Sequence, residues 1–93
     1  MTTHKFRPDY AVPPGWVLEE HLEVRGISPA EFARRCGCPM QLINEIIAGM
    51  ASVEEETALL FEKELGLAAG IWLGIEQQYR LHQTRKAEAQ ESG

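Results

Sequence analysis

Apolar residues recur at steps of three and four along most of this chain, and polar residues fill the positions between them. This period is typical of amphipathic helices. Glycine and proline interrupt the pattern and divide it into five segments, at about residues 15–25, 29–36, 39–48, 53–65 and from 68 onward. The pattern therefore predicts an all-α fold of five helices.

The second of these segments begins with a clear start signal. Ser28 can cap the helix, Pro29 suits its first position, and Glu31 completes a capping box. The first segment has a clear end, because the cation Arg25 precedes Gly26 there.

The stretch 29–48 predicts two short helices joined by a tight turn. Ala33 lies where the second helix must pass close, Gly37 falls at the turn, and Ile43 faces inward from the second helix. The other inward positions are Phe32, Cys36, Cys38, Ile46 and Ile47. This arrangement is typical of helix-turn-helix, whose second helix can enter a DNA major groove. An αα-hairpin inside another small helical bundle fits the same spacing.

The last segment carries an apolar stripe that suggests a partner surface. Its members are Ile71, Trp72, Ile75, Tyr79 and His82. We expect a dimer interface here, with simple packing onto the first helix as the alternative. The chain then divides into an N-terminal arm at 1–12, the helical domain at 13–85 and a flexible tail at 86–93.

Length and composition fit one small soluble domain. The 93 residues are 44% hydrophobic and 25% charged, and no apolar run approaches the roughly 20 residues that span a bilayer. The first residues contain no apolar signal core, so we expect a cytoplasmic protein without a membrane partner.

The net charge of −5 argues against strong non-specific affinity for nucleic acid, because that affinity comes from Lys and Arg. The distribution of charge matters more than its sum. Arg34 and Arg35 lie within the helix pair and are candidate phosphate contacts, together with Ser28. The acidic run 54–56 falls in the first turn of the fourth helix, where the helix dipole favours negative charge.

Other chemistry is not indicated. Cys36 and Cys38 read as small hydrophobic residues beside Gly37, kept reduced, and the three histidines have no metal-ligand spacing. The chain contains no Ser–His–Asp set, no paired carboxylates in a plausible cleft and no Gly-rich phosphate loop. We therefore expect no enzyme activity, no metal and no cofactor.

Three motifs together resemble a known family, the HigA-type antitoxins. These are the plasmid-maintenance antidote branch of the Cro/CI-like (XRE) helix-turn-helix proteins. The motifs are Pro14-Gly15 opening the first helix, Ile43-Asn44-Glu45 with Gly49 closing the third, and Trp72-Leu73 followed by Tyr79. The resemblance covers about residues 13–85.

The resemblance implies a five-helix, lambda repressor-like domain that forms a homodimer through its C-terminal helix. It also implies a transcriptional repressor that binds palindromic operator DNA upstream of its own operon and neutralises a HigB-like toxin, usually a ribosome-dependent mRNA interferase.

The chain departs from the family pattern at its expected DNA contacts. Members often carry Gln at the position of Pro29, and Arg or Lys near the positions of Met40 and Leu42. Where Lys-Arg often follows the third helix, this chain has Met50-Ala51. The alternative function is therefore a toxin-neutralising or other protein-interaction module of the same fold, with weakened or lost DNA binding.

Several side chains on the third helix can still read bases. Gln41 and Asn44 can each pair with adenine, Glu45 can accept from cytosine N4, and Met40 can touch a thymine methyl group. A solvated polar surface is the plainer interpretation of the two amides.

Overall fold

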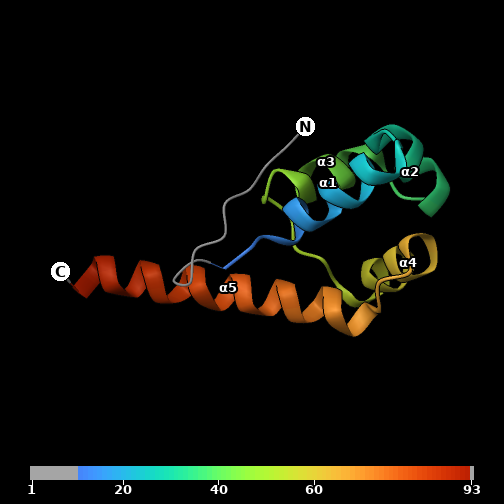
Figure 1. Cartoon of the computed structure of the whole chain (residues 1–93). Coiled ribbons are helices and arrows are strands. Elements are labelled where there is room, and N and C mark those ends of the chain that lie inside the picture. Colours follow the sequence, from blue (N-terminus) through green and yellow to red (C-terminus); the bar gives the residue numbers. More distant parts are fainter. Residues whose placement is uncertain (1–10, 93) are drawn as a thin grey trace.

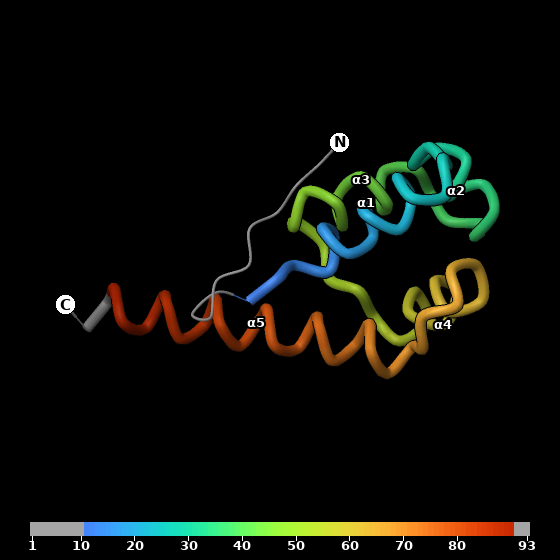
Figure 2. Tube along the Cα trace, viewed as in Figure 1, coloured from blue at the N-terminus to red at the C-terminus, as the bar shows by residue number. Residues whose placement is uncertain are grey.

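The computed structural model describes residues 11–92, and within this range all the regular secondary structure is helical. The helices are α1 (Pro14–Arg25), α2 (Pro29–Cys36), α3 (Met40–Ile47), α4 (Glu55–Leu65) and α5 (Ala69–Ser92). The first four gather at one end of the molecule, and α5 runs beneath them and extends well past them (Figure 1). The tube view shows the same arrangement, with the two ends of α5 far apart (Figure 2). The predicted all-α, five-helix fold is confirmed.

Local signals fixed most helix ends. The start of α2 is as predicted, since the Ser28 hydroxyl accepts a hydrogen bond from the backbone N–H of Glu31 at 3.1 Å. The expected capping box is only half formed, because the Glu31 carboxylate pairs with Arg34 and Arg35 instead of the backbone N–H of Ser28. The start of α4 is two residues later than expected. Val53 lies outside the helix and is buried, and its N–H donates to the Glu76 carboxylate at 3.0 Å.

The expectation of a frayed C-terminal tail was wrong as regards secondary structure. Helix α5 continues to Ser92, through residues that we assigned to a flexible tail. These residues include Lys, Glu, Ala and Gln, which have high helix propensity and need no apolar face to favour helix. Of the predicted N-terminal arm, residues 1–10 lie outside the described part of the chain.

Every helix contributes a fully buried side chain to one core. These side chains are Leu18, Phe32, Ile43, Phe61 and Trp72, one from each helix in turn. The three aromatic rings form a chain, with centroids 5.3 Å apart for Phe32 and Phe61 and 5.1 Å apart for Phe61 and Trp72. The second contact is edge-to-face, which is a favoured geometry for aromatic pairs. The core therefore ties α5 to the helix-turn-helix through α4.

The start of α1 lies directly against the end of α3. A Cβ placed on Gly15 would lie only 2.7 Å from the Cα of Ile47 and would also collide with the carbonyl oxygen of Ile46. Both of these neighbours are backbone atoms, which cannot move aside as a flexible side chain can. The absence of a side chain at Gly15 therefore sets how closely α3 approaches α1.

We expect Gly15→Ala to lower the free energy of unfolding by about 2 kcal/mol or more, as overpacking against backbone does. Gly70→Ala is the matched control. A Cβ on Gly70 meets nothing within 4 Å, so this substitution should be neutral or stabilise α5 by up to about 1 kcal/mol. Urea unfolding followed by tryptophan fluorescence measures both. Equal stability of the two variants would contradict the close approach.

Candidate nucleic-acid interface

The turn between α2 and α3 has the geometry that the sequence predicted. Gly37 adopts a left-handed φ of 72°, and the N–H of Cys38 donates to the carbonyl of Ala33 at 2.9 Å. Ala33 is only 3% exposed, so its small side chain is fully used in the contact between the two helices. Ile43 is fully buried behind α3. The structure thus confirms a helix-turn-helix in which the apolar side of α3 packs against the core.

Seating α3 in this way leaves its polar side chains on the outer side. Gln41 and Asn44 are exposed, Met40 is 40% exposed, and Glu45 is half-buried. The Gln41 amide nitrogen donates a hydrogen bond to the Glu45 carboxylate at 3.1 Å. One N–H and the carbonyl oxygen of Gln41 remain available, because a primary amide has two donors and an acceptor. The structure therefore brings the four predicted base-reading residues together on one side of α3.

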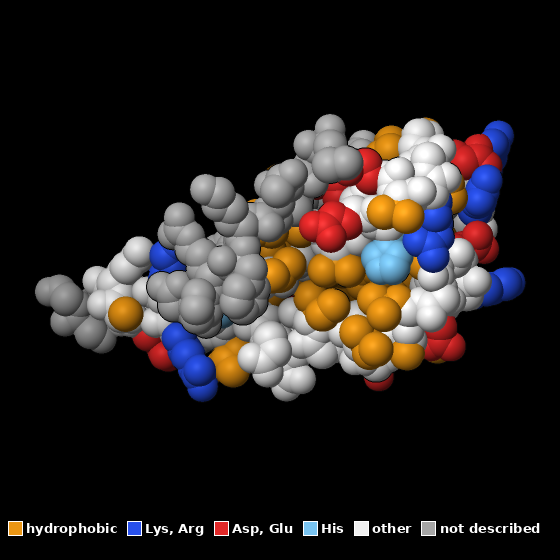
Figure 3. Space-filling model, in the orientation of Figure 1, with side chains coloured by type: hydrophobic (Ala, Val, Ile, Leu, Met, Phe, Trp, Pro, Cys, Tyr) orange, Lys and Arg blue, Asp and Glu red, His pale blue; other side chains and the backbone are white. Residues whose placement is uncertain are grey.

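The predicted phosphate contacts lie on α2. Ser28 caps this helix as an acceptor, so its hydroxyl proton is still available as a donor. The side chains of Arg34 and Arg35 are 77% and 49% exposed. In a space-filling view, Lys and Arg side chains gather at the end of the molecule that carries α2 (Figure 3).

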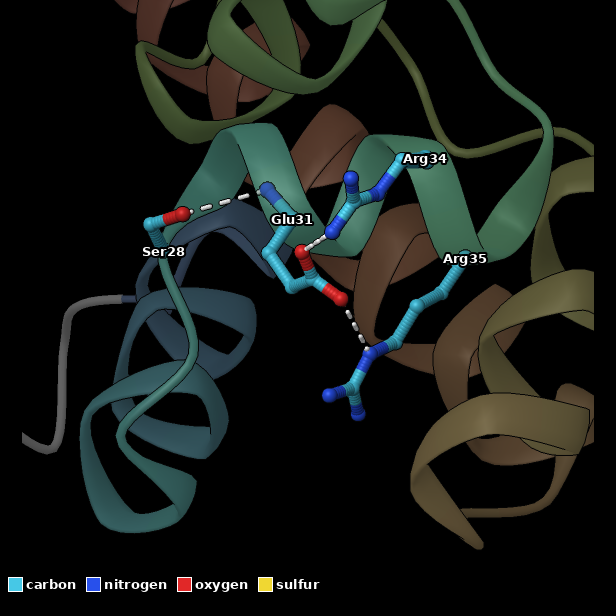
Figure 4. Close-up of polar contacts among 4 residues, drawn as sticks. All are labelled: Ser28, Glu31, Arg34 and Arg35. Atoms are coloured by element: carbon cyan, nitrogen blue, oxygen red, sulfur yellow. Dashed lines mark hydrogen bonds and ion pairs between the residues drawn. The ribbon is translucent and has the colours of Figure 1, made fainter.

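The sequence interpretation missed an acidic partner of these arginines. The Glu31 carboxylate forms an ion pair with Arg34 through one oxygen and with the Nε of Arg35, at 3.0 Å, through the other (Figure 4). The spacing could have predicted it, because residues three and four apart are neighbours on a helix surface.

The residues predicted for a dimer interface divide between two faces of α5. Ile71 is 50% exposed, and with Ile75 and His82 it lines a groove along the helix. The groove is also lined by residues that we did not predict, namely Ala11, Val12, Gly74, Gln77, Gln78, Leu81 and Arg85. Repeating steps of three and four from Ile71 would have found most of them.

Two predicted interface residues lie elsewhere. Trp72 is fully buried in the core of the single chain, so its assignment to a partner surface was wrong. It sits one residue from Ile71, which rotates it by about 100° around the helix and toward α4. Tyr79 is half-buried, and its hydroxyl lies 3.7 Å from where a Cβ of Gly49 would be, so it faces the end of α3.

Helix α5 also holds the segment that follows α3. Glu76 is only 8% exposed, accepts the hydrogen bond from Val53 and forms an ion pair with Arg80. A buried carboxylate needs such partners. Sequence reasoning did not single out Glu76, although its step of four from Trp72 places it on the same inner side of α5.

Burial shifts the pKa values of three groups near the helix pair in the direction that favours their neutral forms. Burial raises the pKa of the Cys36 thiol to about 12, with the neighbouring Cys38 as a lesser cause, and burial also raises the pKa of Cys38. Burial and the charge of Arg25 lower the pKa of His21, whose ring packs 5.9 Å from that of Trp72. Both cysteines are free thiols.

Two further searches were confined to the part of the chain that the structure describes. No three His, Cys, Asp or Glu side chains within it come together as metal ligands. None of the helices there combines the length and the apolar character needed to cross a bilayer.

Comparison with known proteins places these features in context. No family model matches the chain. A curated relative is the uncharacterized HTH-type transcriptional regulator YddM of Escherichia coli (strain K12), which is 25% identical over 73 residues, covering 78% of each chain.

Three solved structures share the fold. A protein from Nostoc punctiforme, assigned as an antidote protein of a plasmid maintenance system, is 29% identical and has a TM-score of 0.86, covering 89% of this chain and 91% of its own. PA4674 of Pseudomonas aeruginosa, solved in complex with its operator DNA, is 25% identical with a TM-score of 0.78, covering 89% and 87%.

The third structure is the Pseudomonas aeruginosa antitoxin HigA with the higBA promoter. It is 23% identical with a TM-score of 0.81, covering 87% of this chain and 89% of its own. The resemblance drawn from the sequence is therefore confirmed: this chain shares the five-helix helix-turn-helix fold of the HigA-type antidote proteins.

Proposed function

We propose that this protein is a DNA-binding antitoxin that represses its own operon as a homodimer in the cytoplasm and neutralises a HigB-like toxin. The observation that carries the proposal is the outward placement of Gln41 and Asn44 on a helix that is packed from behind. The operator complex of PA4674 and the promoter complex of HigA support it, because both of those proteins share this fold.

We infer distinct tasks for the two helices. Side chains of α3 enter the major groove, where Gln41 and Asn44 each pair with adenine through an amide oxygen and N–H. Side chains of α2 contact the backbone, with Arg34 and Arg35 on phosphate oxygens. Glu45 orients the Gln41 amide through their hydrogen bond, which reduces the rotamer freedom lost on binding.

The second candidate function is a protein-interaction module that neutralises a toxin without binding DNA. It is favoured by the charge of the helix pair, since residues 29–51 contain two cations and two carboxylates. Co-purification with a small basic protein encoded beside this gene, together with no retention of the upstream duplex at low salt, would support this function over the first.

The groove on α5 provides the surface for the proposed homodimer. A second copy placed against it would cover the exposed apolar side chains Ile71 and Leu81, which are 50% and 40% exposed in the single chain. Covering apolar surface is the main driving force of such association. Two recognition helices in one dimer would then match the two half-sites of a palindrome.

Gln41→Ala and Asn44→Ala should each weaken binding to the duplex upstream of the gene by about 1–3 kcal/mol, because each removes a base contact. Affinity for a random-sequence duplex of the same length should not change, since the phosphate contacts remain. Fluorescence anisotropy with both duplexes measures this. Gln90→Ala, exposed near the end of α5, is the control. Equal losses on both duplexes would contradict base reading.

Ile75→Glu should convert the dimer to a monomer, because it places a charge in an apolar interface. We expect the dissociation constant of the dimer to rise by at least about 100-fold. Sedimentation velocity over a range of concentrations measures it. Thr84→Glu, exposed on the same helix, should leave the dimer intact. A monomeric parent chain, or a dimeric Ile75→Glu variant, would exclude this interface.

A further inference from the structure

The two proposed phosphate contacts on α2 are already engaged by an anion of the same helix. Figure 4 shows the Glu31 carboxylate between Arg34 and Arg35, with one oxygen directed to each guanidinium group. The side chain of Glu31 is 31% exposed, less than those of Arg34 and Arg35. In the free protein, both cations of the segment 29–51 are therefore paired.

A carboxylate and a DNA phosphate offer the same chemistry to an arginine. Both are anions with oxygen acceptors that match the planar guanidinium group. A phosphate approaching α2 must take over N–H groups that now bond to Glu31, or share the arginine with it. Either event lowers the gain from the contact.

The carboxylate is not needed for the cap at the start of α2. The Ser28 hydroxyl accepts from the backbone N–H of Glu31, which any non-proline residue supplies. The ion pairs themselves are at the surface, where such pairs contribute little to stability. Removing the charge of Glu31 should therefore cost the fold only the modest favourable effect of an acidic residue in the first turn of α2.

We propose that Glu31 is an internal competitor of the DNA phosphates, which lowers the affinity of α2 for the DNA backbone irrespective of base sequence. This inference rests on the proposed DNA-binding function. Glu31 would set the affinity for DNA without contacting bases. Its effect falls equally on operator and non-operator DNA, because phosphates carry no sequence information.

Glu31→Gln tests the proposal, because it removes the charge and keeps the size and helix propensity of the side chain. We expect affinity to rise on the order of fivefold for the upstream duplex and for a random-sequence duplex alike. The slope of log K against log salt should steepen by about 1 to 2, as one or two phosphate contacts become complete. Anisotropy titrations over a salt series measure both quantities.

Two comparisons isolate the competition. Glu20→Gln makes the same change in net charge at an exposed position on α1 and should not reproduce the gain. Glu31→Gln should also give no gain in affinity when it is added to a variant that already carries Arg34→Gln and Arg35→Gln, because no arginine is then released. Circular dichroism and thermal unfolding establish that all variants keep the fold.

The outcomes separate this inference from the function on which it rests. If the parent protein binds the upstream duplex and Glu31→Gln binds no tighter, the competition is excluded and the proposed function stands. A similar gain from Glu20→Gln, or a gain that persists without the two arginines, also excludes competition, since general charge or direct repulsion would then suffice. If neither the parent nor any variant binds the upstream duplex at low salt, the proposed function fails and takes this inference with it.

Discussion

The close contact between the backbones of α1 and α3 is the constraint on which the rest of this structure depends. Because Gly15 has no side chain, the first turn of α1 lies directly against Ile46 and Ile47. The apolar side of α3 is then fully occupied by protein, with Ile43 and Ile46 buried. The polar residues of α3 have only the solvent side left to them. The outward position of the proposed base-reading residues therefore follows from the packing of the apolar side of α3.

Helix α5 connects α3, the proposed recognition helix, to the proposed dimer surface. Its inner side holds Trp72 in the core and Glu76 on the backbone N–H of Val53, just after α3. Its outer side holds Ile71 and Ile75 along the groove. A rigid link of this kind transmits the geometry of the dimer to the two recognition helices, and half-site spacing depends on that geometry. In the proposed dimer, one helix would therefore set both the assembly and the alignment of the recognition helices.

The sequence predicted the helix ends that local hydrogen bonds determine. It did not predict which side of a long helix faces the core. The cap at Ser28 and the turn at Gly37 placed α2 to the residue, because hydrogen bonds over a few positions determine such ends. The apolar stripe on α5 could not show that Trp72 points inward, since a long helix can have one apolar side for the core and another for a partner. The ion pairs of Glu31 could have been predicted from helical spacing. Their effect depends on whether a DNA phosphate approaches α2.

The charge of the helix pair connects these points to the proposed function. Phosphate contacts contribute affinity without sequence information, and base contacts contribute the information. In residues 29–51 the cations and carboxylates are equal in number, so this segment offers little net attraction to a duplex. On the proposed function, discrimination among DNA sites would then rest chiefly on the amides of α3. Under the proposed competition, a carboxylate paired with Arg34 and Arg35 lowers the affinity for every duplex by the same factor and leaves the ratio between operator and other DNA unchanged. Because genomic DNA offers many competing sites, such weakening frees protein from them while the base contacts keep their preference for the operator.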